Sequence, residues 1–546
     1  MRSANPHSTR RLQDCVGSER LTEAISSNNV RRRISRLFIA LCVPLACTEA
    51  DRAPRPSFRL IFTPVTGALM TSSSPGIIDL SGDGVADIVF GTGVDRIAPG
   101  REQYGLRPDP EISGYTVAVS GATNQILWSV PNPRDAFTTP RFVELSGDGV
   151  PDVIMGGREG VLTAFSGADG ALLWRTTGAS VAATSVPFNF FTPALIRDVN
   201  GDGVRDLAVL YGGDDTRPPN TSRTVGYVTL ISAADGQVIA VHETPDSAET
   251  YSSGTVYERA DGTEWLVFGT GGETHGGTAY RAPVASLLNG RFAERVERLV
   301  EPGSKGVIAP AVIVELTGDD EPDIVISTFD GRLIAVDGAT GARLWEQRGD
   351  GEETYHPPAV LRRAPARAPG LFVSRGRGVF PNYAGSVHRL IDAADGNVLF
   401  EYENSFSPGG APLAVDLTGD DIDEPIFFSV RFPGQQSSRV HVLHLASGKL
   451  ITYDLPTIFG TTPVIADPRD TGTLEMIGLA WQIHADSALE ANPAFRPDST
   501  TVSWRDMRWQ LIRLDLSAPV PEFMSWSGYM GTAMDGQFRP PPSYPR

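Results

Sequence analysis

The residues with the most evident chemistry form an acidic loop between Asp198 and Asp206. Asp198, Asn200 and Asp202 occupy alternate positions, Asp206 takes the ninth, and the carbonyl of Val204 lies at the seventh. Calcium binds six to eight oxygen ligands at about 2.3–2.6 Å, whereas magnesium requires a stricter octahedron with several waters. The two glycines inside the loop permit the tight turns that such a ring of oxygens needs. The spacing therefore predicts a calcium site.

Four more loops repeat this spacing, and each offers side-chain oxygens at the same positions and a carbonyl at the seventh. Their predicted ligands are Asp79, Ser81, Asp83, Val85 and Asp87; Glu144, Ser146, Asp148, Val150 and Asp152; Glu315, Thr317, Asp319, Glu321 and Asp323; and Asp416, Thr418, Asp420, Ile422 and Glu424. Like charges in one turn are costly unless a cation neutralises them. We predict several structural calcium ions; the alternative is a set of ion-free Asx turns in hairpins.

A sixth copy runs from Asp467 to Glu475, but Arg469 and Thr471 replace two of its ligands. We expect no metal there, because the guanidinium would lie where the ion would otherwise bind. No catalytic residues emerge from the repeat.

Each acidic loop joins two apolar strands, as in the segments 77–90, 142–155 and 196–209. A second repeat follows, clearest over 332–345, in which two strands are joined by a short turn that contains glycine. Each pair of repeats therefore gives four antiparallel strands, the meander that builds one blade of a β-propeller. The predicted fold class is all-β.

The spacing of the loops predicts the number of blades. The intervals from Asp198 to Glu315 and from Glu315 to Asp416 are nearly double the others, so each should contain a blade without an acidic loop, at 254–300 and 357–402. Six blades with an acidic loop and two blades without one give about eight four-stranded blades, with seven as the alternative. We expect an N-terminal signal over 1–47, a tether over 48–59, one propeller over 60–520, and a C-terminal tail or closing segment over 521–546.

The repeats resemble two known groups of propellers. The acidic loop with its following strand resembles the FG-GAP or VCBS-type repeat of integrin α-subunits and bacterial relatives. The segment Ala335-x-Asp337-x-x-Thr340-Gly341-x-x-x-Trp345 resembles the tryptophan-docking blades of quinoprotein, or PQQ-type, propellers. The resemblance covers roughly residues 60–515. It implies that Trp128, Trp174 and Trp345 pack between blades and do not stack on a ligand.

The N-terminus is typical of an export signal. Arg31, Arg32, Arg33 and Arg36 precede an apolar run over 37–46 that is too short to span a bilayer as a helix. The run ends at Cys47, which would become the acylated first residue if this is a bacterial lipoprotein signal. Plain secretion is the alternative. We expect a protein of the bacterial periplasm, outer membrane or cell surface.

Charge and cysteine content exclude several classes of function. The chain carries a net charge of −18, and its first 50 residues hold eight Arg against four acids, so the remainder carries −22. Such a body repels nucleic acid and anionic membranes, so we expect membrane contact only through a lipid anchor. All three cysteines precede residue 50, which excludes disulfides, cysteine-ligated zinc and a cysteine nucleophile from the body.

A meander alternates its loops between the two faces of a propeller. The acidic loops and the glycine turns share one face, and the longer loops gather on the other, where variable loops on rigid blades commonly bind ligands. The predicted ligand face carries Arg101, Tyr104, Arg217, His275, Arg375, Tyr383, Trp481 and His484. The alternative is that these residues belong to ordinary solvated loops.

These observations favour a non-enzymatic, monomeric binding or adhesion module for a protein or polysaccharide ligand. The first alternative is an enzyme on the same scaffold, either a quinone-dependent dehydrogenase or a polysaccharide lyase. The second is an assembly scaffold of the envelope, a role that resembles that of quinoprotein-like lipoproteins without cofactor. Fold analogy alone does not decide among them.

Overall fold

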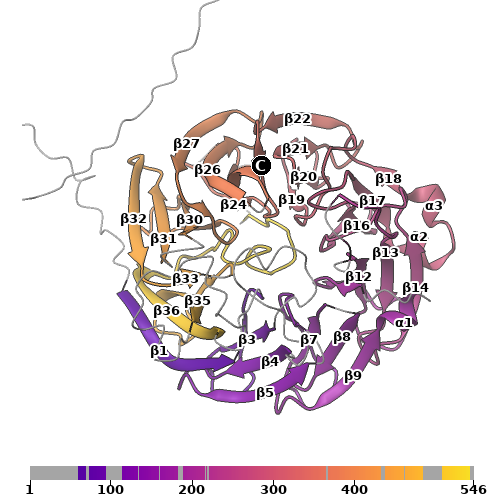
Figure 1. Cartoon of the computed structure of the whole chain (residues 1–546), viewed down its shortest axis with the longest axis horizontal. Coiled ribbons are helices and arrows are strands. Elements are labelled where there is room, and N and C mark those ends of the chain that lie inside the picture. The colour runs from indigo at the N-terminus through magenta and orange to yellow at the C-terminus, as the bar shows by residue number, and fades with distance from the viewer. Residues whose placement is uncertain are drawn as a thin grey trace, which may run out of the picture. The chain divides into compact units, whose positions relative to one another are not determined.

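The computed structural model describes residues 59–68, 73–93, 114–132, 135–158, 160–182, 188–214, 217, 220–364, 367–380, 382–431, 437–459, 461–483 and 507–540. They form eight small antiparallel sheets arranged around a common centre (Figure 1). The predicted eight-bladed propeller is confirmed, and the seven-bladed alternative is excluded. No helix among the described residues is long and apolar enough to cross a membrane.

The first four blades follow one another along the chain, with strands A to D running from the inner to the outer edge. Blade 1 consists of β2 (Gly76–Ile78), β3 (Asp87–Thr92), β4 (Gly114–Val119) and β5 (Ile126–Asn132). Blade 2 consists of β6 (Arg141–Val143), β7 (Asp152–Gly156), β8 (Val161–Phe165) and β9 (Leu172–Thr177). Blade 3 consists of β10 (Asn189–Phe190), β11 (Ala194–Leu195), β12 (Leu207–Gly212), β13 (Tyr227–Ile231) and β14 (Val238–Glu243), and blade 4 consists of β15 (Thr255–Glu258), β16 (Glu264–Gly269), β17 (Ala279–Pro283) and β18 (Glu297–Arg298). Short helices α1 (Gly178–Val181), α2 (Val284–Leu288) and α3 (Phe292–Arg295) lie between strands.

The next three blades repeat the same order. Blade 5 consists of β19 (Val312–Val314), β20 (Asp323–Ser327), β21 (Arg332–Val336) and β22 (Arg343–Arg348); blade 6 of β23 (Glu352–Glu353), β24 (Ala359–Leu361), β25 (Gly370–Val379), β26 (Asn382–Asp392) and β27 (Val398–Asn404); and blade 7 of β28 (Ser407–Pro408), β29 (Leu413–Val415), β30 (Glu424–Arg431), β31 (Ser437–His444) and β32 (Lys449–Leu455). Blades 4 and 6 are the two units without an acidic loop, as predicted from the wide intervals.

Blade 8 joins the two ends of the described chain and closes the ring. It contains β33 (Ile458–Phe459), β34 (Val464–Ala466), β35 (Thr473–Ile483), β36 (Met507–Pro519) and, as its outer strand D, the N-terminal strand β1 (Arg59–Ala68). Strand β1 pairs antiparallel with β36, from Arg59 opposite Asp515 to Ala68 opposite Arg508. Figure 1 shows the indigo strand β1 beside the yellow strand β36. Ring closure therefore depends on an N-terminal strand added to a C-terminal sheet.

Neighbouring blades are tied together through the short C–D turns. The indole nitrogens of Trp128, Trp174 and Trp345 donate to the carbonyls of Gly167, Ala233 and Ala393 in the following blade, at 2.8, 2.7 and 2.8 Å. Two junctions use an arginine instead, from Arg281 to Gly338 and from Arg513 to Gly121, at 2.5 and 2.6 Å. The predicted role of the three tryptophans in packing between blades is confirmed.

The segment 520–540 leaves blade 8 and crosses the centre of the ring (Figure 1). Its backbone pairs with three inner strands: Trp526 exchanges two hydrogen bonds with Ala414, Gly536 and Phe538 bond Ile313, and Ser527 accepts from Ile465. Trp526 is fully buried in the core shared by blades 5, 6 and 7. This C-terminal segment holds the inner edges of several blades together, and β1 closes the ring.

We expect Trp526→Ala to lower the free energy of unfolding by about 3–5 kcal/mol, because it removes a fully buried indole and leaves a cavity. Chemical denaturation followed by circular dichroism measures the change. Val520→Ala, at an exposed position of the same segment, serves as the control and should leave the unfolding midpoint nearly unchanged. Equal midpoints for Trp526→Ala and the native chain would show that the segment does not stabilise the ring.

Two buried histidines face each other across blades 6 and 7. The rings of His388 and His441 lie 6.2 Å apart and both pack against Phe427. Each ring is hydrogen-bonded to a buried hydroxyl. His388 bonds Ser374 at 3.0 Å, and His441 bonds Ser429 at 2.9 Å. Burial lowers the pKa of His441 to about 4 and the pKa of His388 well below its usual value. Both rings are therefore neutral in the folded protein near pH 6.

The free energy of unfolding should fall as the pH drops below about 6.5, because these histidines become protonated in the unfolded chain while they stay neutral in the folded protein. For His441 the loss continues to about pH 4 and reaches about 3 kcal/mol at most. Urea midpoints between pH 7.5 and 4.5 measure it. His441→Gln should flatten the dependence, whereas His444→Gln, at a position less buried on the same strand, should not. An unchanged slope in His441→Gln would contradict the assignment.

Candidate functional site

The acidic loops share one hydrogen-bond pattern. The carboxylate at the first position accepts the N–H of the glycine three residues later, at 2.7, 2.6, 2.6, 2.5 and 2.7 Å for Asp79, Glu144, Asp198, Glu315 and Asp416. The carboxylate at the fifth position accepts the N–H two residues on, at 2.8, 2.8, 2.8, 3.0 and 3.1 Å for Asp83, Asp148, Asp202, Asp319 and Asp420. The loops are therefore shaped largely by their own backbone donors.

The ninth carboxylate connects the acidic loop to the C–D turn of its own blade. In blade 1 one oxygen of the buried Asp87 accepts from Leu80 and Ser81, and the other accepts the N–H of Gly121, all at 3.0 Å. Asp152 and Asp323 make the same bond to Gly167 and Gly338, at 3.0 and 2.8 Å. In these three blades both oxygens of the ninth residue have protein partners.

This connection requires glycine in the turn. A Cβ atom at Gly121, Gly167 or Gly338 would lie about 2 Å from the carbonyl oxygen of the residue before the ninth carboxylate, namely 2.0, 2.0 and 1.9 Å. Such a distance is well inside van der Waals contact, so a larger residue must hold the turn farther from the loop. The turn residue therefore decides whether the carboxylate is fully satisfied.

Blades 3 and 7 lack the glycine and differ accordingly. Ala233 and Leu445 occupy the equivalent turn positions, and one oxygen each of Asp206 and Glu424 is buried without a hydrogen-bond partner. Burial, with Asp202 and Asp198 nearby, raises the pKa of Asp206. Burial, with Asp420 and Asp416 nearby, raises the pKa of Glu424 to about 9. A buried carboxylate in this position needs a proton or a cation.

The loop of blade 3 offers the donor set that fits calcium best. Asp198, Asp202 and Asp206 are hard oxygen donors, and Asp206 supplies the unpartnered buried oxygen. Across the described residues, no three His, Cys, Asp or Glu side chains are already arranged to hold a metal ion. An ion would therefore have to draw the exposed Asp198 and Asp202 carboxylates toward the buried Asp206.

The sixth loop uses guanidinium groups instead. Arg469 lies 2.7 Å from one oxygen of Glu475, and the buried Arg513 lies 2.6 Å from the other. Two cationic side chains thus pair with the ninth carboxylate of blade 8, and the absence of a metal from this copy stays a prediction.

The predicted ligand-face residues fall into separate surroundings. Arg217 pairs with Asp214 at 3.0 Å, and His275 lies 3.9 Å from Glu249 in the loops of blades 3 and 4. Trp481 lies within β35, opposite Ile458 and Trp509. The remaining predictions, Arg101, Tyr104, His484 and the lipidation site Cys47, lie outside the described residues.

Arg375 requires a correction. Its guanidinium is 1 % exposed and pairs with Glu352 at 3.3 Å inside blade 6. Burial lowers its pKa to about 10. The long hairpin of β25 and β26 reaches Val379, so Arg375 lies well inside strand B and not in the loop beyond it. The prediction that Arg375 reaches the ligand face is wrong.

Tyr383 belongs to an aromatic patch that the sequence analysis missed. The patch consists of Phe329 from the loop between β20 and β21 of blade 5, Tyr355 from the segment between β23 and β24 of blade 6, and Val379, Phe380 and Tyr383 around the tip of the β25–β26 hairpin. Phe329 is buried and lies 6.3 Å from the Tyr355 ring and 6.4 Å from the Phe380 ring. Tyr355, Val379 and Phe380 are exposed, at 38, 64 and 44 %. These side chains offer an apolar surface on the face opposite the acidic loops.

A buried ion pair supports the aromatic patch. Lys305, one of only two lysines in the chain, pairs with Glu353 and lies 5.1 Å from the centre of the Phe329 ring. The other oxygen of Glu353 accepts from the backbone of Phe380 at 2.7 Å and from the Tyr383 hydroxyl at 3.2 Å. The rarity of lysine was the one signal in the sequence that could have directed attention here.

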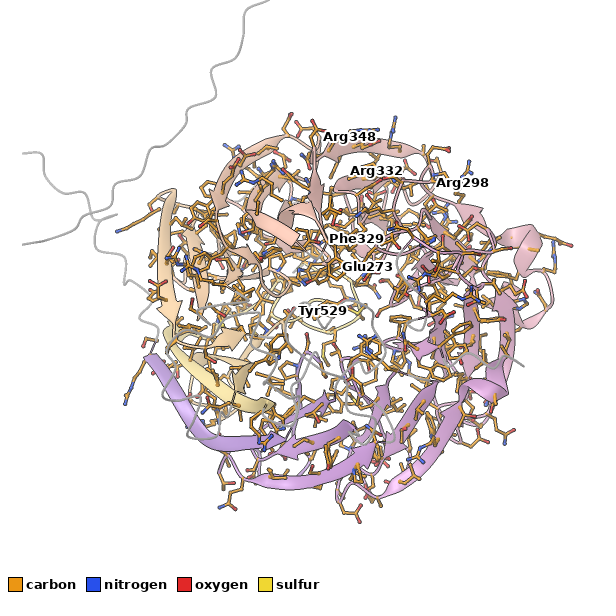
Figure 2. The ribbon with its side chains drawn as sticks, in the orientation of Figure 1. Glu273, Arg298, Phe329, Arg332, Arg348 and Tyr529 are labelled. Carbon is orange, nitrogen blue, oxygen red and sulfur yellow. The ribbon has the colours of Figure 1, made fainter. Side chains whose placement is uncertain are left out.

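The patch continues toward the ring axis. Burial, with Tyr355, Glu353 and Glu273 nearby, raises the pKa of Tyr383. Tyr529 of the C-terminal segment also has a raised pKa, because it is buried and lies near Tyr355. Figure 2 shows Glu273, Phe329 and Tyr529 together on the inner side of the ring. The phenols of Tyr383 and Tyr529 are therefore protonated at neutral pH.

Comparisons with known proteins match two parts of the chain to family models. Residues 76–281 match the FAM234A/B beta-propeller, and residues 302–467 match a PQQ-type repeat described as outer membrane protein assembly factor BamB. No curated protein matches the chain. The matches support the quinoprotein-type part of the resemblance, while the FG-GAP part stays a prediction.

Solved structures show the same fold at low identity. A europium-containing methanol dehydrogenase is 11 % identical with a TM-score of 0.52, covering 83 % of this chain and 93 % of its own. A quinohemoprotein alcohol dehydrogenase from Comamonas testosteroni is 11 % identical with a TM-score of 0.50, covering 85 and 78 %. BamB from Moraxella catarrhalis is 12 % identical with a TM-score of 0.45, covering 84 and 100 %. The similarity to the two dehydrogenases shows the propeller fold alone.

Proposed function

We propose that this chain is an exported, non-enzymatic propeller of the bacterial envelope that binds a protein or polysaccharide through the aromatic patch. The observation that carries the proposal is the exposure of Tyr355, Val379 and Phe380 around the buried Phe329. Exposed apolar surface next to polar groups marks interaction sites more often than chance, and aromatic side chains dominate binding hot spots. The ion pair of Lys305 and Glu353 holds this surface in place before a ligand arrives.

The envelope location is supported by two independent observations. The basic and apolar run before Cys47 is typical of an export signal, with Cys47 as the acylated residue. The family model that matches residues 302–467 is described as an outer membrane protein assembly factor. This match spans Lys305, Phe329, Tyr355 and Phe380, so the assembly-scaffold alternative uses the same surface and differs only in its partner.

The course of the C-terminal segment supports a binding role over a dehydrogenase. Residues 520–540 cross the centre of the ring, where Trp526 packs in the core and Tyr529 lies near Tyr355. A cofactor on the axis would have to displace this segment from its hydrogen bonds with Ala414 and Ile313. Addition of quinone and calcium, followed by an assay of alcohol-dependent dye reduction, tests the alternative directly.

We expect the paired substitution Tyr355→Ala and Phe380→Ala to abolish capture of ligand, because it removes both exposed rings of the patch. Pull-down from envelope extracts detects a protein ligand, and a glycan array detects a polysaccharide. Leu288→Ala, an exposed apolar residue in α2, is the matched control and should bind like the native chain. Retention of all binding by the double variant, with native melting, would contradict the site.

We further propose that calcium stabilises the propeller, with the loop of blade 3 as its best site. Support comes from the unpartnered oxygen of Asp206 and the raised pKa that its neighbours impose. An ion there would remove the cost of burying that charge.

Chelation should therefore lower the melting temperature by several degrees, and Asp202→Ala should remove part of that shift. Differential scanning calorimetry with and without chelator measures both. Asp470→Ala, in the loop where Arg469 already pairs with Glu475, should keep the full shift. A melting temperature that does not respond to chelator would show that the acidic loops need no ion.

A further inference from the structure

Three blades expose a pair of apolar residues at the start of their outer strand. The pairs are Ile126 and Leu127 on β5, Leu172 and Leu173 on β9, and Val398 and Leu399 on β27; together we call them the apolar rim. Each of the six side chains is between 37 and 51 % exposed. Blades 1, 2 and 6 thus repeat one feature at one register position.

The apolar rim lies on the face of the acidic loops. Each pair follows directly after a C–D turn, and in blades 1 and 2 the N–H of Gly121 and of Gly167 in these turns donates to the carboxylates of Asp87 and Asp152. Strand D therefore begins on the acidic-loop face and runs toward the aromatic patch. Blades 1 and 2 lie across the ring from blade 6 (Figure 1), so a flat surface that approaches this face meets pairs on both sides.

The N-terminal strand also begins on this face. β1 is strand D of blade 8, and Arg59 pairs with Asp515 near the end of β36, where Pro519 lies opposite Thr473 of the sixth acidic loop. Cys47 precedes Arg59 by twelve positions, a stretch that spans at most roughly 40 Å when fully extended. A lipid on Cys47 would therefore be tied to the start of β1 by no more than that length of chain.

We propose that the apolar rim contacts the surface of a lipid bilayer and that the acidic-loop face is the membrane-facing side of the propeller. This inference rests on the proposed acylation of Cys47. Apolar side chains repeated on one face gain free energy in the interfacial layer of a bilayer. The acidic loops on the same face repel anionic headgroups, so the surface fits uncharged or zwitterionic lipid.

The orientation has a consequence for binding. The aromatic patch lies at the opposite face, around the β20–β21 loop of blade 5 and the tip of the β25–β26 hairpin of blade 6. With the apolar rim on the membrane, Tyr355 and Phe380 point into the aqueous space, where a soluble or extended ligand can reach them.

Fluorescence quenching in vesicles tests the orientation. The body contains no cysteine, so a fluorophore attached to Leu172→Cys reports the apolar rim, and one attached to Glu301→Cys, whose side chain is 80 % exposed beyond the end of β18, reports the opposite face. The acylated chain is bound to phosphatidylcholine vesicles that carry a quencher in their acyl chains. We expect most of the emission to be lost at Leu172→Cys and almost none at Glu301→Cys.

A third chain carries the label at Leu172→Cys together with Leu127→Ser and Leu399→Ser, and it should lose about half of the quenching. Equal quenching at the two labels, stronger quenching at Glu301→Cys, or none at either would overturn the orientation.

Failure of acylation is recognised separately, by the mass of the N-terminal peptide and by release of Cys47→Ser from the membrane fraction of producing cells. If the native chain is not acylated, the proposed lipid anchor on Cys47 is wrong. The quenching is then measured on a chain that begins at residue 48 and carries an N-terminal histidine tag, which binds it to vesicles containing nickel-chelating lipid. Quenching at Leu172→Cys in that arm supports the apolar rim by itself, and its absence overturns it.

Discussion

In blades 1, 2 and 5 the order of the ring depends on the glycine of the C–D turn. Its N–H binds the ninth carboxylate of the acidic loop in its own blade, and its carbonyl receives the tryptophan or arginine of the preceding blade. Gly167 does both, with Asp152 on one side and Trp128 on the other. One residue therefore couples the internal order of a blade to its junction with the preceding blade, through the two peptide groups that flank its Cα atom.

This coupling changes the meaning of the acidic motif. A loop rich in carboxylates suggests a cation, yet in blades 1, 2 and 5 the ninth carboxylate already has backbone donors for both oxygens. A buried carboxylate oxygen that still requires a proton or a cation is found where the glycine has been replaced, at Asp206 and Glu424. Loops of similar sequence thus differ in how fully the ninth carboxylate is satisfied, and the difference is set by a turn residue 15 to 34 positions farther along the chain.

The fold could be predicted from the sequence because a propeller repeats local contacts. Strands, acidic loops and glycine turns recur within each blade, and the two silent blades were evident from the intervals between loops. Contacts of long sequence separation were not accessible in this way. The pairing of β1 with β36, the insertion of Trp526 between inner strands, and the meeting of Lys305 with Glu353 each join segments that no period connects. The aromatic patch was missed for this reason.

The same reasoning explains why the two faces divide their tasks. The turn glycine and the ninth carboxylate require close backbone approach, so the acidic-loop face can accept little variation in length. The opposite face has no such constraint, and its loops differ in length from blade to blade. In blade 6 the hairpin of β25 and β26 is long enough to carry Val379 and Phe380 to its tip, with the Phe380 ring 6.4 Å from the Phe329 ring. Rigid packing on one face is therefore the condition that allows the other to present an exposed aromatic surface.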